Sequence, residues 1–413
     1  MAPKPNDARF MQQALELARR GIALASPNPR VGAVVVSASG RLVGRGTHTY
    51  DGIKHAEVLA LETAGDRAKG GTLYLNLEPC SHVGRTGPCA DVIVAAGIKR
   101  VVAAMRDPNP LVAGRGFERL AAAGVEVEEG LCEGDARKLN EAFARYIRYK
   151  TPFVTLKTAM TLDGKIAPPP GDTIYPATMS SMAATGGWIT SEVARAHVHE
   201  MRHANDAIMV GVGTIIADDP LLTDRTGLPR RRPLLRVILD SRLRLPLDSR
   251  VVRTADYDVV VFCCFAEERK RQELEERGII VEQVPMRQPL EDGTIPFPSG
   301  AQTSDGRPDL ERVLARLGER EITSIIIEGG AMVNWAALSA GIVDKIYFYY
   351  APKILAGTGS IPLALGTGYR RISEAAYVRS LTLHRFGEDF AVEGYLRDPY
   401  ADVIHVVPDH SHS

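Results

Sequence analysis

One imidazole and two thiols in the first hundred residues could together hold a metal ion. His55 opens a predicted helix, Cys80 follows the end of a predicted strand, and Cys89 comes nine residues after Cys80. Three such ligands leave a tetrahedral zinc with its fourth position open, the arrangement of a catalytic rather than a structural site. Because zinc lowers the pKa of bound water to roughly 7, the pattern predicts a centre that supplies hydroxide at neutral pH.

A glutamate accompanies the predicted metal ligands. Glu57 lies two residues after His55 and can reach the bound water without ligating the metal. In zinc deaminases a glutamate in this role takes the water proton and passes it to the departing amine. Each of these residues alone is more often a core cysteine or a surface histidine. The joint pattern of H-x-E, a strand, P-C and a second cysteine predicts hydrolytic deamination of a pyrimidine, with Glu57 as the catalytic residue.

Alternating helical and strand patterns must position these residues, and they predict an α/β layered domain over residues 1–150. The predicted helices span 7–20, 55–64, 89–96, 117–123 and 135–149, and the predicted strands span 31–36, 41–47, 72–77, 100–105 and 125–129.

A second domain is predicted to begin at residue 151, because Pro152 stops the preceding helix. Its predicted strands are 153–157, 207–212, 235–240, 259–263, 279–284, 324–328, 345–351 and 390–396, and its predicted helices are 191–203, 267–277, 310–317 and 332–339. Eight strands with few helices predict one large sheet with crossover helices, ending near residue 400. Residues 167–187 and 288–309 are predicted loops, and 401–413 a mobile tail.

Composition narrows the class of protein. A chain of 413 residues is long enough for two domains, and 50 Lys and Arg against 50 Asp and Glu give a net charge of zero. The broad positive field of a nucleic-acid binder is therefore not expected, and a small-molecule partner is favoured. No apolar run is long enough for a membrane span, and no secretory signal pattern is present. Five irregularly spaced cysteines do not form a disulfide pattern, so a cytoplasmic protein is expected.

Several strings in the first half resemble one known family. They are Pro27-Asn28-Pro29-x-Val31-Gly32, Gly46-x-His48, His55-Ala56-Glu57, Leu77-Glu78-Pro79-Cys80-Ser81-His82-x-Gly84-Arg85-Thr86, Asp107-Pro108-Asn109-Pro110 and Val112-Ala113-Gly114-Arg115-Gly116. With them, and with the eight residues between its two cysteines, the chain resembles the bifunctional deaminase/reductase family of riboflavin biosynthesis to about residue 396. The resemblance implies a cytidine-deaminase-like three-layer domain followed by a dihydrofolate-reductase-like domain.

The resemblance also implies two successive reactions. The first domain would hydrolyse the ring 2-amine of 2,5-diamino-6-(5-phosphoribosylamino)pyrimidin-4(3H)-one with one zinc ion. The second would then reduce the ribosyl chain of the product to ribityl with NADPH. The partner is thus a phosphorylated pyrimidine, neither a nucleic acid nor a membrane is expected as a partner, and a homo-oligomer is expected.

Site residues follow from the resemblance position by position. The implied cofactor-binding residues are Ala159, Trp188, Thr214, Asp218, Ser241, Gly330, Ala331 and Met332. The implied substrate-binding residues are Asn28 and His48 in the first domain and Arg202, Leu222, Arg225 and Glu328 in the second. Guanidinium groups suit a ribose phosphate, and the amides that follow Glu328 at a helix start suit the cofactor phosphates. His82 and Arg85 are further candidate substrate contacts.

Residues 174–187 depart from the family pattern as an apparent insertion of about 14 residues before Trp188. The family serine that contacts substrate then corresponds to Thr173 or Gly186. Two alternatives stay open at this point. The second domain could bind nucleotide without catalysis, which the insertion favours. The chain could also be a nucleic-acid base deaminase, which the zero net charge and the long spacing between the cysteines oppose.

Overall fold

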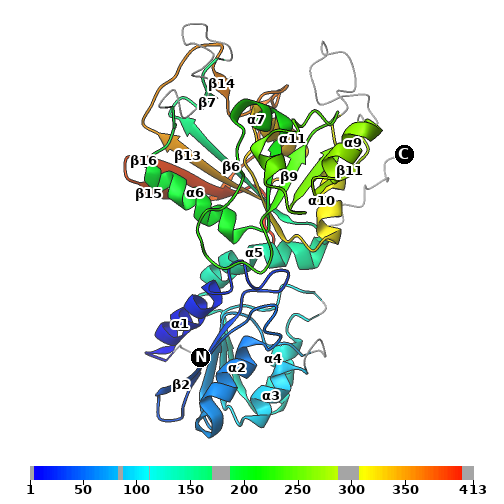
Figure 1. Ribbon diagram of the computed structural model, residues 1–413. Helices are drawn as coiled ribbons and strands as arrows, with labels where there is room; N and C mark the ends of the chain where they lie inside the picture. Colours follow the sequence, from blue (N-terminus) through cyan, green and yellow to red (C-terminus); the bar gives the residue numbers. More distant parts are fainter. Residues whose placement is uncertain (1–3, 82–86, 111, 170–186, 287–306, 402–413) are drawn as a thin grey trace, which may run out of the picture.

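The computed structural model describes residues 4–81, 87–110, 112–169, 187–286 and 307–401. Two α/β bodies are stacked end to end, and helix α5 (Glu133–Tyr149) lies between them (Figure 1). The insertion up to residue 186, residues 288–306 of the second predicted loop, the tail from residue 402, and the candidates His82, Arg85 and Thr173 lie outside the described residues.

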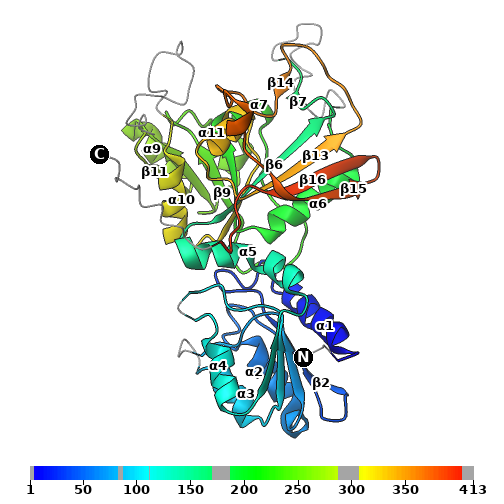
Figure 2. The ribbon, with the colours of Figure 1, turned by 180° about the vertical axis from the view of Figure 1, so that it is seen from behind.

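The first body is a five-stranded mixed sheet with helices on both faces. Its helices are α1 (Asp7–Arg19), α2 (Ala56–Ala64), the short 3₁₀ helix η1 (Gly65–Ala68), α3 (Cys89–Ala95) and α4 (Arg115–Ala122), and its strands are β1 (Gly32–Val36), β2 (Leu42–Thr47), β3 (Thr72–Leu75), β4 (Arg100–Ala103) and β5 (Glu126–Glu129). The strand order is β2-β1-β3-β4-β5, antiparallel on the β2 side of β3 and parallel on the β5 side. Helix α1 covers one face, and α2, α3 and α4 cover the other (Figure 2). The predicted three layers are confirmed, with strand ends shifted by up to two residues.

The second body is built on a nine-stranded sheet in the order β11-β10-β9-β8-β12-β6-β13-β16-β15. Its strands are β6 (Phe153–Thr161), β8 (Ala207–Gly211), β9 (Leu235–Leu239), β10 (Val259–Cys263), β11 (Ile279–Gln283), β12 (Ser324–Ile327), β13 (Lys345–Ala351), β15 (Arg379–Phe386) and β16 (Asp389–Tyr395). The seven strands from β11 to β13 are parallel, and β16 and β15 continue the sheet in antiparallel pairing. The predicted single large sheet is therefore confirmed.

Helices pack on both faces of this second sheet. They are α6 (Glu192–Ala204), α7 (Val212–Asp218), α8 (Arg250–Arg253), α9 (Glu268–Glu275), α10 (Leu310–Glu319) and α11 (Ala331–Ser339), with a 3₁₀ turn η3 (Ile372–Glu374) and a small β7 (Lys165–Ala167) and β14 (Ile361–Pro362) pair beside the sheet. The sequence prediction missed α7, α8, η3, β7, β14 and β15. Parallel strands with crossover helices bring the carboxyl ends of β6, β8, β9 and β12 to one edge, where open α/β sheets bind ligands. Among the described residues, no helix combines the length and apolarity needed to cross a membrane.

Candidate zinc centre and reductase site

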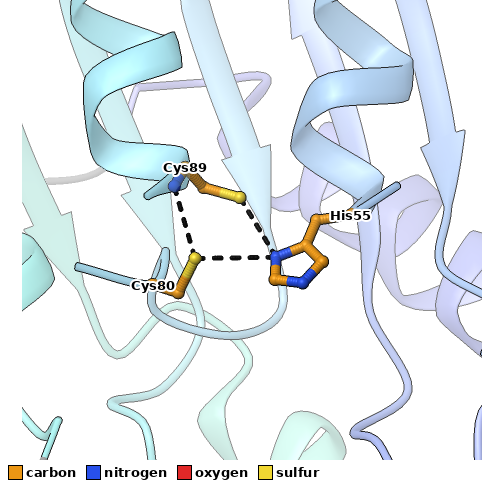
Figure 3. Close-up of side chains that lie close together, drawn as sticks. All are labelled: His55, Cys80 and Cys89. Carbon is orange, nitrogen blue, oxygen red and sulfur yellow. Dashed lines mark hydrogen bonds between the residues drawn. The ribbon is translucent and has the colours of Figure 1, made fainter. Parts of the chain in front are cut away.

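Three side chains from three different elements converge in the first body (Figure 3). His55 is the residue before α2, Cys80 lies beyond the end of β3, and Cys89 is the first residue of α3. Their ligand atoms all lie within 4.8 Å of one another. His55 Nδ1 is 3.1 Å from Cys89 Sγ and 3.6 Å from Cys80 Sγ. The structure thus brings together the three predicted metal ligands.

The donor set and its spacing fit zinc. Zinc–sulfur bonds near 2.3 Å and zinc–nitrogen bonds near 2.0 Å, set at tetrahedral angles, separate the ligand atoms by roughly 3.5 Å. Hydrogen bonds from Cys89 and His55 lower the pKa of the Cys80 thiol, whereas the hydrogen bond with Cys80 and burial raise the pKa of Cys89. A thiol pair that shares one proton in this way is poised to lose it to a cation.

Glu57 lies in the first turn of α2, and its side chain is buried, with 3% of the residue exposed. Burial raises the pKa of the Glu57 carboxyl, although the neighbouring His55 acts to lower it. The carboxyl also hydrogen-bonds with Cys89. Glu57 therefore stands beside the three converging ligands, with the pKa of its carboxyl raised by burial, in the position that an acid–base group requires.

Close contact between α2 and β2 brings the first turn of α2 to the site. A Cβ atom on Gly46 would lie 2.0 Å from the carbonyl oxygen of Ala56, and one on Gly44 would lie 2.1 Å from that of Ala60. Only glycine lets the helix approach the strand this closely, so Gly46 places His55 and Glu57 at the sheet.

Gly46→Ala is expected to destabilise the first body by about 1–3 kcal/mol, because α2 must move away from β2. The zinc content of the purified variant should fall as well, since His55 begins the displaced helix. Urea unfolding and metal analysis measure the two effects. Gly134→Ala is the matched control, because a Cβ there meets no atom within 4 Å. Equal stability and zinc content in the two variants would contradict the proposed role of Gly46.

Glu78 holds the turn that carries Cys80, a role that sequence reasoning missed. Its buried carboxylate accepts hydrogen bonds from the backbone N–H groups of Asp107 (3.1 Å), Gly114 (2.9 Å) and Gly116 (2.8 Å). The three family strings that contain these residues therefore contact one another through Glu78. A glutamate directly before Pro-Cys, just beyond the end of a strand that leads to the site, was the available signal.

Asn28 and His48 form a polar pair next to the predicted metal ligands. Asn28 Nδ2 lies 3.0 Å from His48 Nε2, and His48 Nδ1 lies 3.0 Å from the carbonyl oxygen of Lys54. The His48 ring stands edge-on to the ring of His55, with 5.3 Å between centroids. Both predicted substrate residues of the first domain thus lie at the zinc centre.

In the second body, Glu328 lies between two cations at the carboxyl end of β12. Arg202 donates to its carboxylate through Nε (2.6 Å) and Nη2 (3.0 Å), and Lys157 donates through Nζ (3.2 Å). The three side chains are only 10–15% exposed. Although burial acts to raise it, the two cations hold the pKa of Glu328 at about 2. Arg202 is therefore not on a solvated helix face, the ordinary interpretation of a helical arginine. Lys157, which was not predicted as a site residue, also belongs to this cluster.

Leu222 and Arg225 lie close to this cluster on the chain that follows α7. Arg202 Nη1 donates to the carbonyl oxygen of Thr223 at 2.9 Å. Both Leu222 (φ 57°) and Arg225 (φ 56°) have left-handed backbone conformations, which residues with a Cβ adopt only when their surroundings hold them there. Leu222 is buried and Arg225 is exposed, so the Arg225 guanidinium is open to a ligand.

The predicted cofactor residues gather at the carboxyl edge of neighbouring strands. Thr214 and Asp218 lie in α7 after β8, Ser241 follows β9, and Ala159 lies in β6 opposite Tyr349. A Cβ on Gly330 would lie 3.9 Å from Thr214 Oγ1, so α7 and the start of α11 face each other.

The start of α11 fits a dinucleotide phosphate. Gly330 precedes the helix, Ala331 is its buried first residue, and Met332 is 44% exposed. A Cβ on Gly329 would lie 2.6 Å from Val333 Cβ, so the turn requires glycine. Bare helix amides at this sheet edge suit an anion such as the NADPH phosphates. Trp188 lies outside this group, half exposed before α6, with the Arg195 guanidinium 4.8 Å from its ring centroid.

A cavity of about 630 Å³ lies away from both sites, between α5, α6 and the second sheet. Its lining includes Arg30, Thr155, Lys345 and Glu393, and no predicted site residue within the described ranges borders it. The two candidate sites are therefore defined by their clusters of polar side chains and not by this cavity.

Comparison with known proteins agrees with both halves of the structure. Residues 4–105 match the family described as cytidine and deoxycytidylate deaminase zinc-binding region, and residues 152–392 match the RibD C-terminal domain. The riboflavin biosynthesis protein RibD of Aquifex aeolicus is 40% identical over 387 residues, covering 94% of this chain and 97% of that protein. The Escherichia coli K12 protein of the same name is 36% identical, covering 93% and 97%.

Two solved structures of related proteins are similar to this one along nearly the whole chain. The RibD structure of Acinetobacter baumannii (form 1) has a TM-score of 0.76 at 35% identity and covers 94% of this chain and 98% of its own. A Thermotoga maritima diaminohydroxyphosphoribosylaminopyrimidine deaminase/5-amino-6-(5-phosphoribosylamino)uracil reductase has a TM-score of 0.72 at 35% identity, with the same coverage. With a deaminase zinc-binding region and a reductase domain in one chain, the protein belongs to the RibD family of bifunctional riboflavin-biosynthesis enzymes.

Proposed function

We propose that residues 1–150 deaminate 2,5-diamino-6-(5-phosphoribosylamino)pyrimidin-4(3H)-one and that residues 151–400 then reduce the ribosyl chain of the product with NADPH. The observation that carries the proposal is the presence of two complete polar clusters in one chain. One consists of His55, Cys80 and Cys89 beside the buried Glu57, and the other is centred on Glu328. Membership in the family supports the same pair of reactions.

In the deaminase reaction, water replaces the ring amine, which leaves as ammonia. Zinc held by the three ligands supplies a Lewis acid and a water of lowered pKa. Glu57 accepts a proton at its carboxylate and donates it to the departing amine, and its buried position keeps that proton from bulk water. Asn28 and His48 bind the substrate beside the centre, where their mutual hydrogen bond fixes their orientation.

In the reductase reaction, NADPH supplies a hydride, and the chain provides its binding and orientation. Residues at the carboxyl edge of β6, β8, β9 and β12 hold the cofactor, namely Ala159, Thr214, Asp218, Ser241, Gly330, Ala331 and Met332. Trp188 contacts the cofactor from the segment before α6. Glu328 fixes Arg202 and Lys157 toward the substrate, while Leu222 and Arg225 contact it from the segment after α7.

Arg225→Ala is expected to raise the reductase KM for the phosphorylated intermediate about 10- to 100-fold, because a guanidinium–phosphate pair is lost. The exposed position of Arg225 predicts little change in stability. Deaminase kinetics should not change. Steady-state NADPH oxidation measures the effect, with Arg271→Ala on the exposed face of α9 as the control. Reductase kinetics equal to those of the control would remove Arg225 from phosphate binding.

We also propose that the protein is a cytoplasmic homo-oligomer that acts on a small molecule without nucleic-acid or membrane partners. The free state of all five cysteines and the zero net charge support the compartment and the small-molecule partner. The edge strand β15 supports the oligomer, because Leu381 and Leu383 are 62% and 72% exposed on a strand with an open hydrogen-bonding side.

A further inference from the structure

A segment of the second body runs from the reductase cluster to the deaminase site. This bridging segment, residues 222–232, begins at Leu222 and ends at Arg232, three residues before β9 begins at Leu235. We infer that Arg231, although it belongs to the reductase half of the chain, is a positioning residue for the deaminase reaction. The inference rests on the proposed function, because it assigns part of the deaminase site to the second domain.

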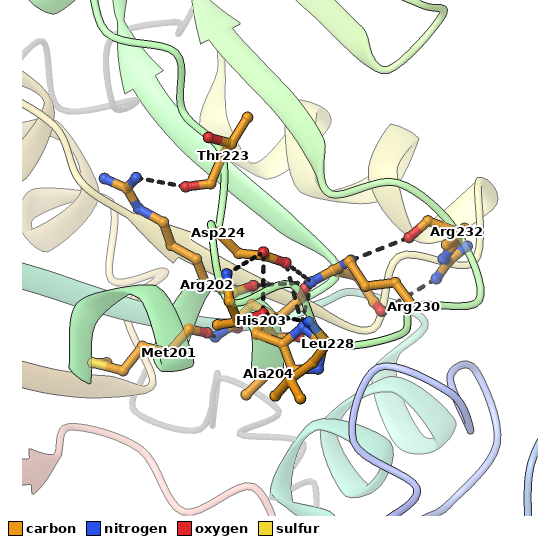
Figure 4. Close-up of polar contacts among 12 residues, drawn as sticks. Met201, Arg202, His203, Ala204, Thr223, Asp224, Leu228, Arg230 and Arg232 are labelled. Atoms are coloured by element: carbon orange, nitrogen blue, oxygen red, sulfur yellow. Dashed lines mark hydrogen bonds and ion pairs between the residues drawn. The ribbon is translucent and has the colours of Figure 1, made fainter. Parts of the chain in front are cut away.

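The middle of the bridging segment is fixed to the end of α6 (Figure 4). Asp224 accepts from Arg230 at 2.9 Å and lies 3.3 Å from His203 Nδ1. Arg230 also donates to the carbonyl oxygens of His203 (2.9 Å) and Asn205 (2.8 Å). These bonds satisfy carbonyl groups that the end of a helix leaves without partners, so the segment caps α6 and is held firmly.

The start of the bridging segment contacts the reductase cluster. Arg202, which pairs with Glu328, also donates to the Thr223 carbonyl oxygen, and this contact is visible in Figure 4. Leu222 and Arg225 flank that carbonyl in left-handed conformations. One end of the segment is therefore part of the proposed reductase site.

The other end of the segment contacts the first body through Arg231. Its guanidinium carbon lies 3.6 Å from the centroid of the Tyr50 ring. The Arg231 Nη1 atom donates to the carbonyl oxygen of Ser26 at 3.0 Å, and the Arg231 backbone N–H donates to the carbonyl oxygen of Ala23 at 3.0 Å. Its Nε also lies 3.5 Å from the exposed carboxylate of Asp51. The Arg231 side chain is only 19% exposed, which strengthens a cation–π contact.

The two loops that Arg231 contacts carry the substrate residues of the deaminase. Ser26 lies two residues before Asn28, and Tyr50 lies two residues after His48. The Tyr50 backbone N–H donates to the Leu24 carbonyl oxygen at 3.0 Å, which ties the loops together. Asn28 and His48 hydrogen-bond to each other across the same two loops. Arg231 therefore fixes the relative position of the two loops from outside the deaminase domain.

Arg232 supports the same contact without reaching the second loop. Its Nη2 lies 3.1 Å from Ser26 Oγ and 3.2 Å from Asp206, and Ser26 Oγ also donates to Asp206 at 2.7 Å. These bonds hold the first loop against the second body even when Arg231 is shortened. Loss of the Arg231 side chain should thus loosen the pairing of the loops without separating the bodies.

The test compares Arg231→Ala with Arg269→Ala, a control that removes an exposed arginine from α9. In the full chain with zinc bound, Arg231→Ala should raise the deaminase KM for the diaminopyrimidinone ribosyl phosphate about tenfold. Its kcat, zinc content and reductase kinetics should stay within twofold of the control. Arg231→Lys keeps a cation over the Tyr50 ring and should give an intermediate KM. A purely structural contact would instead lower activity and zinc content together and would show no partial rescue by lysine.

A deaminase KM equal to that of the control would overturn the inference, as would a fall in kcat and zinc content at unchanged KM. If Arg231→Ala does not fold, Tyr50→Leu removes the same contact from the deaminase side. Tyr50→Leu should raise KM in the same way, and an unchanged KM would overturn the inference. Failure of the proposed function looks different, because the unaltered protein itself would then not deaminate the substrate, and the inference would fall with it.

Discussion

Glu57→Gln should lower the deaminase kcat about 1000-fold while zinc stays bound and the reductase keeps its activity. Glutamine has the shape of glutamate but cannot accept and return a proton. Glu57 is 3% exposed, stands next to the ligand His55, and has a pKa raised by burial, so water or another group cannot easily replace it. Deaminase activity is measured by the release of ammonia, and reductase activity is measured by the oxidation of NADPH. Metal analysis gives the zinc content.

Glu62→Gln is the matched control for this experiment. Glu62 lies on the same helix α2, half exposed, and pairs with Lys54 at 2.7 Å. Its replacement makes the same change of charge and should leave ammonia release within twofold, because exposed ion pairs contribute little. Undiminished turnover in Glu57→Gln would remove Glu57 from proton transfer. A loss of zinc together with activity would make Glu57 a structural residue of the centre.

Glu328→Gln should reduce the reductase kcat/KM by about 100-fold or more and should destabilise the second body. The carboxylate compensates Arg202 and Lys157, whose side chains are 15% and 12% exposed. Breaking a buried ion pair costs about 3–5 kcal/mol, because it leaves buried charge without compensation. The partial exposure of the cluster reduces that cost. Thermal unfolding and NADPH oxidation measure both effects, and the deaminase kinetics should be unchanged.

Glu282→Gln provides the matched comparison for Glu328→Gln. Glu282 also pairs with two cations, Arg316 and Arg320, but these are 51% and 35% exposed. Solvent can take over their charges, so this variant should lose less stability and keep its reductase activity. Equal reductase activity in the two variants would show that Glu328 serves packing alone.

The deaminase centre could be predicted from the sequence because local spacing determines it. His55 directly precedes α2 and Glu57 lies in its first turn, Cys89 begins α3, and Cys80 lies in the segment that joins β3 to α3, so a few residues specify the cluster. The ends of β10 and β13 were also predicted correctly. Strand β10 pairs in parallel with both of its neighbours and is a continuous apolar run, as buried parallel strands are.

The features that were missed depend on contacts distant in sequence or on unusual exposure. Strand β15 is exposed at most of its positions, so it shows no buried face in its pattern. Helix α7 has only seven residues and directly follows β8, so its apolar residues merge with those of the strand. The contact of Arg231 with Tyr50 joins residues far apart in the chain, and no local pattern announces it.

Of the alternatives left open by the sequence, membership in the bifunctional family opposes a nucleic-acid base deaminase. The other hypothesis, that the second domain binds nucleotide without catalysis, was favoured by the insertion. Residues 174–186 of that insertion lie outside the described residues. The paired Glu328 cluster and the exposed Arg225 argue for a working reductase instead.

The central claim is that one chain performs both reactions, and product analysis tests it most directly. The purified zinc-loaded protein would be incubated with the diaminopyrimidinone ribosyl phosphate and NADPH, and the products identified by mass spectrometry. The account predicts that the ring amine is exchanged for oxygen and that two hydrogens are then added, with one NADPH oxidised for each product. Exchange without the added hydrogens would contradict the reductase assignment, and an unchanged amine would contradict the deaminase assignment.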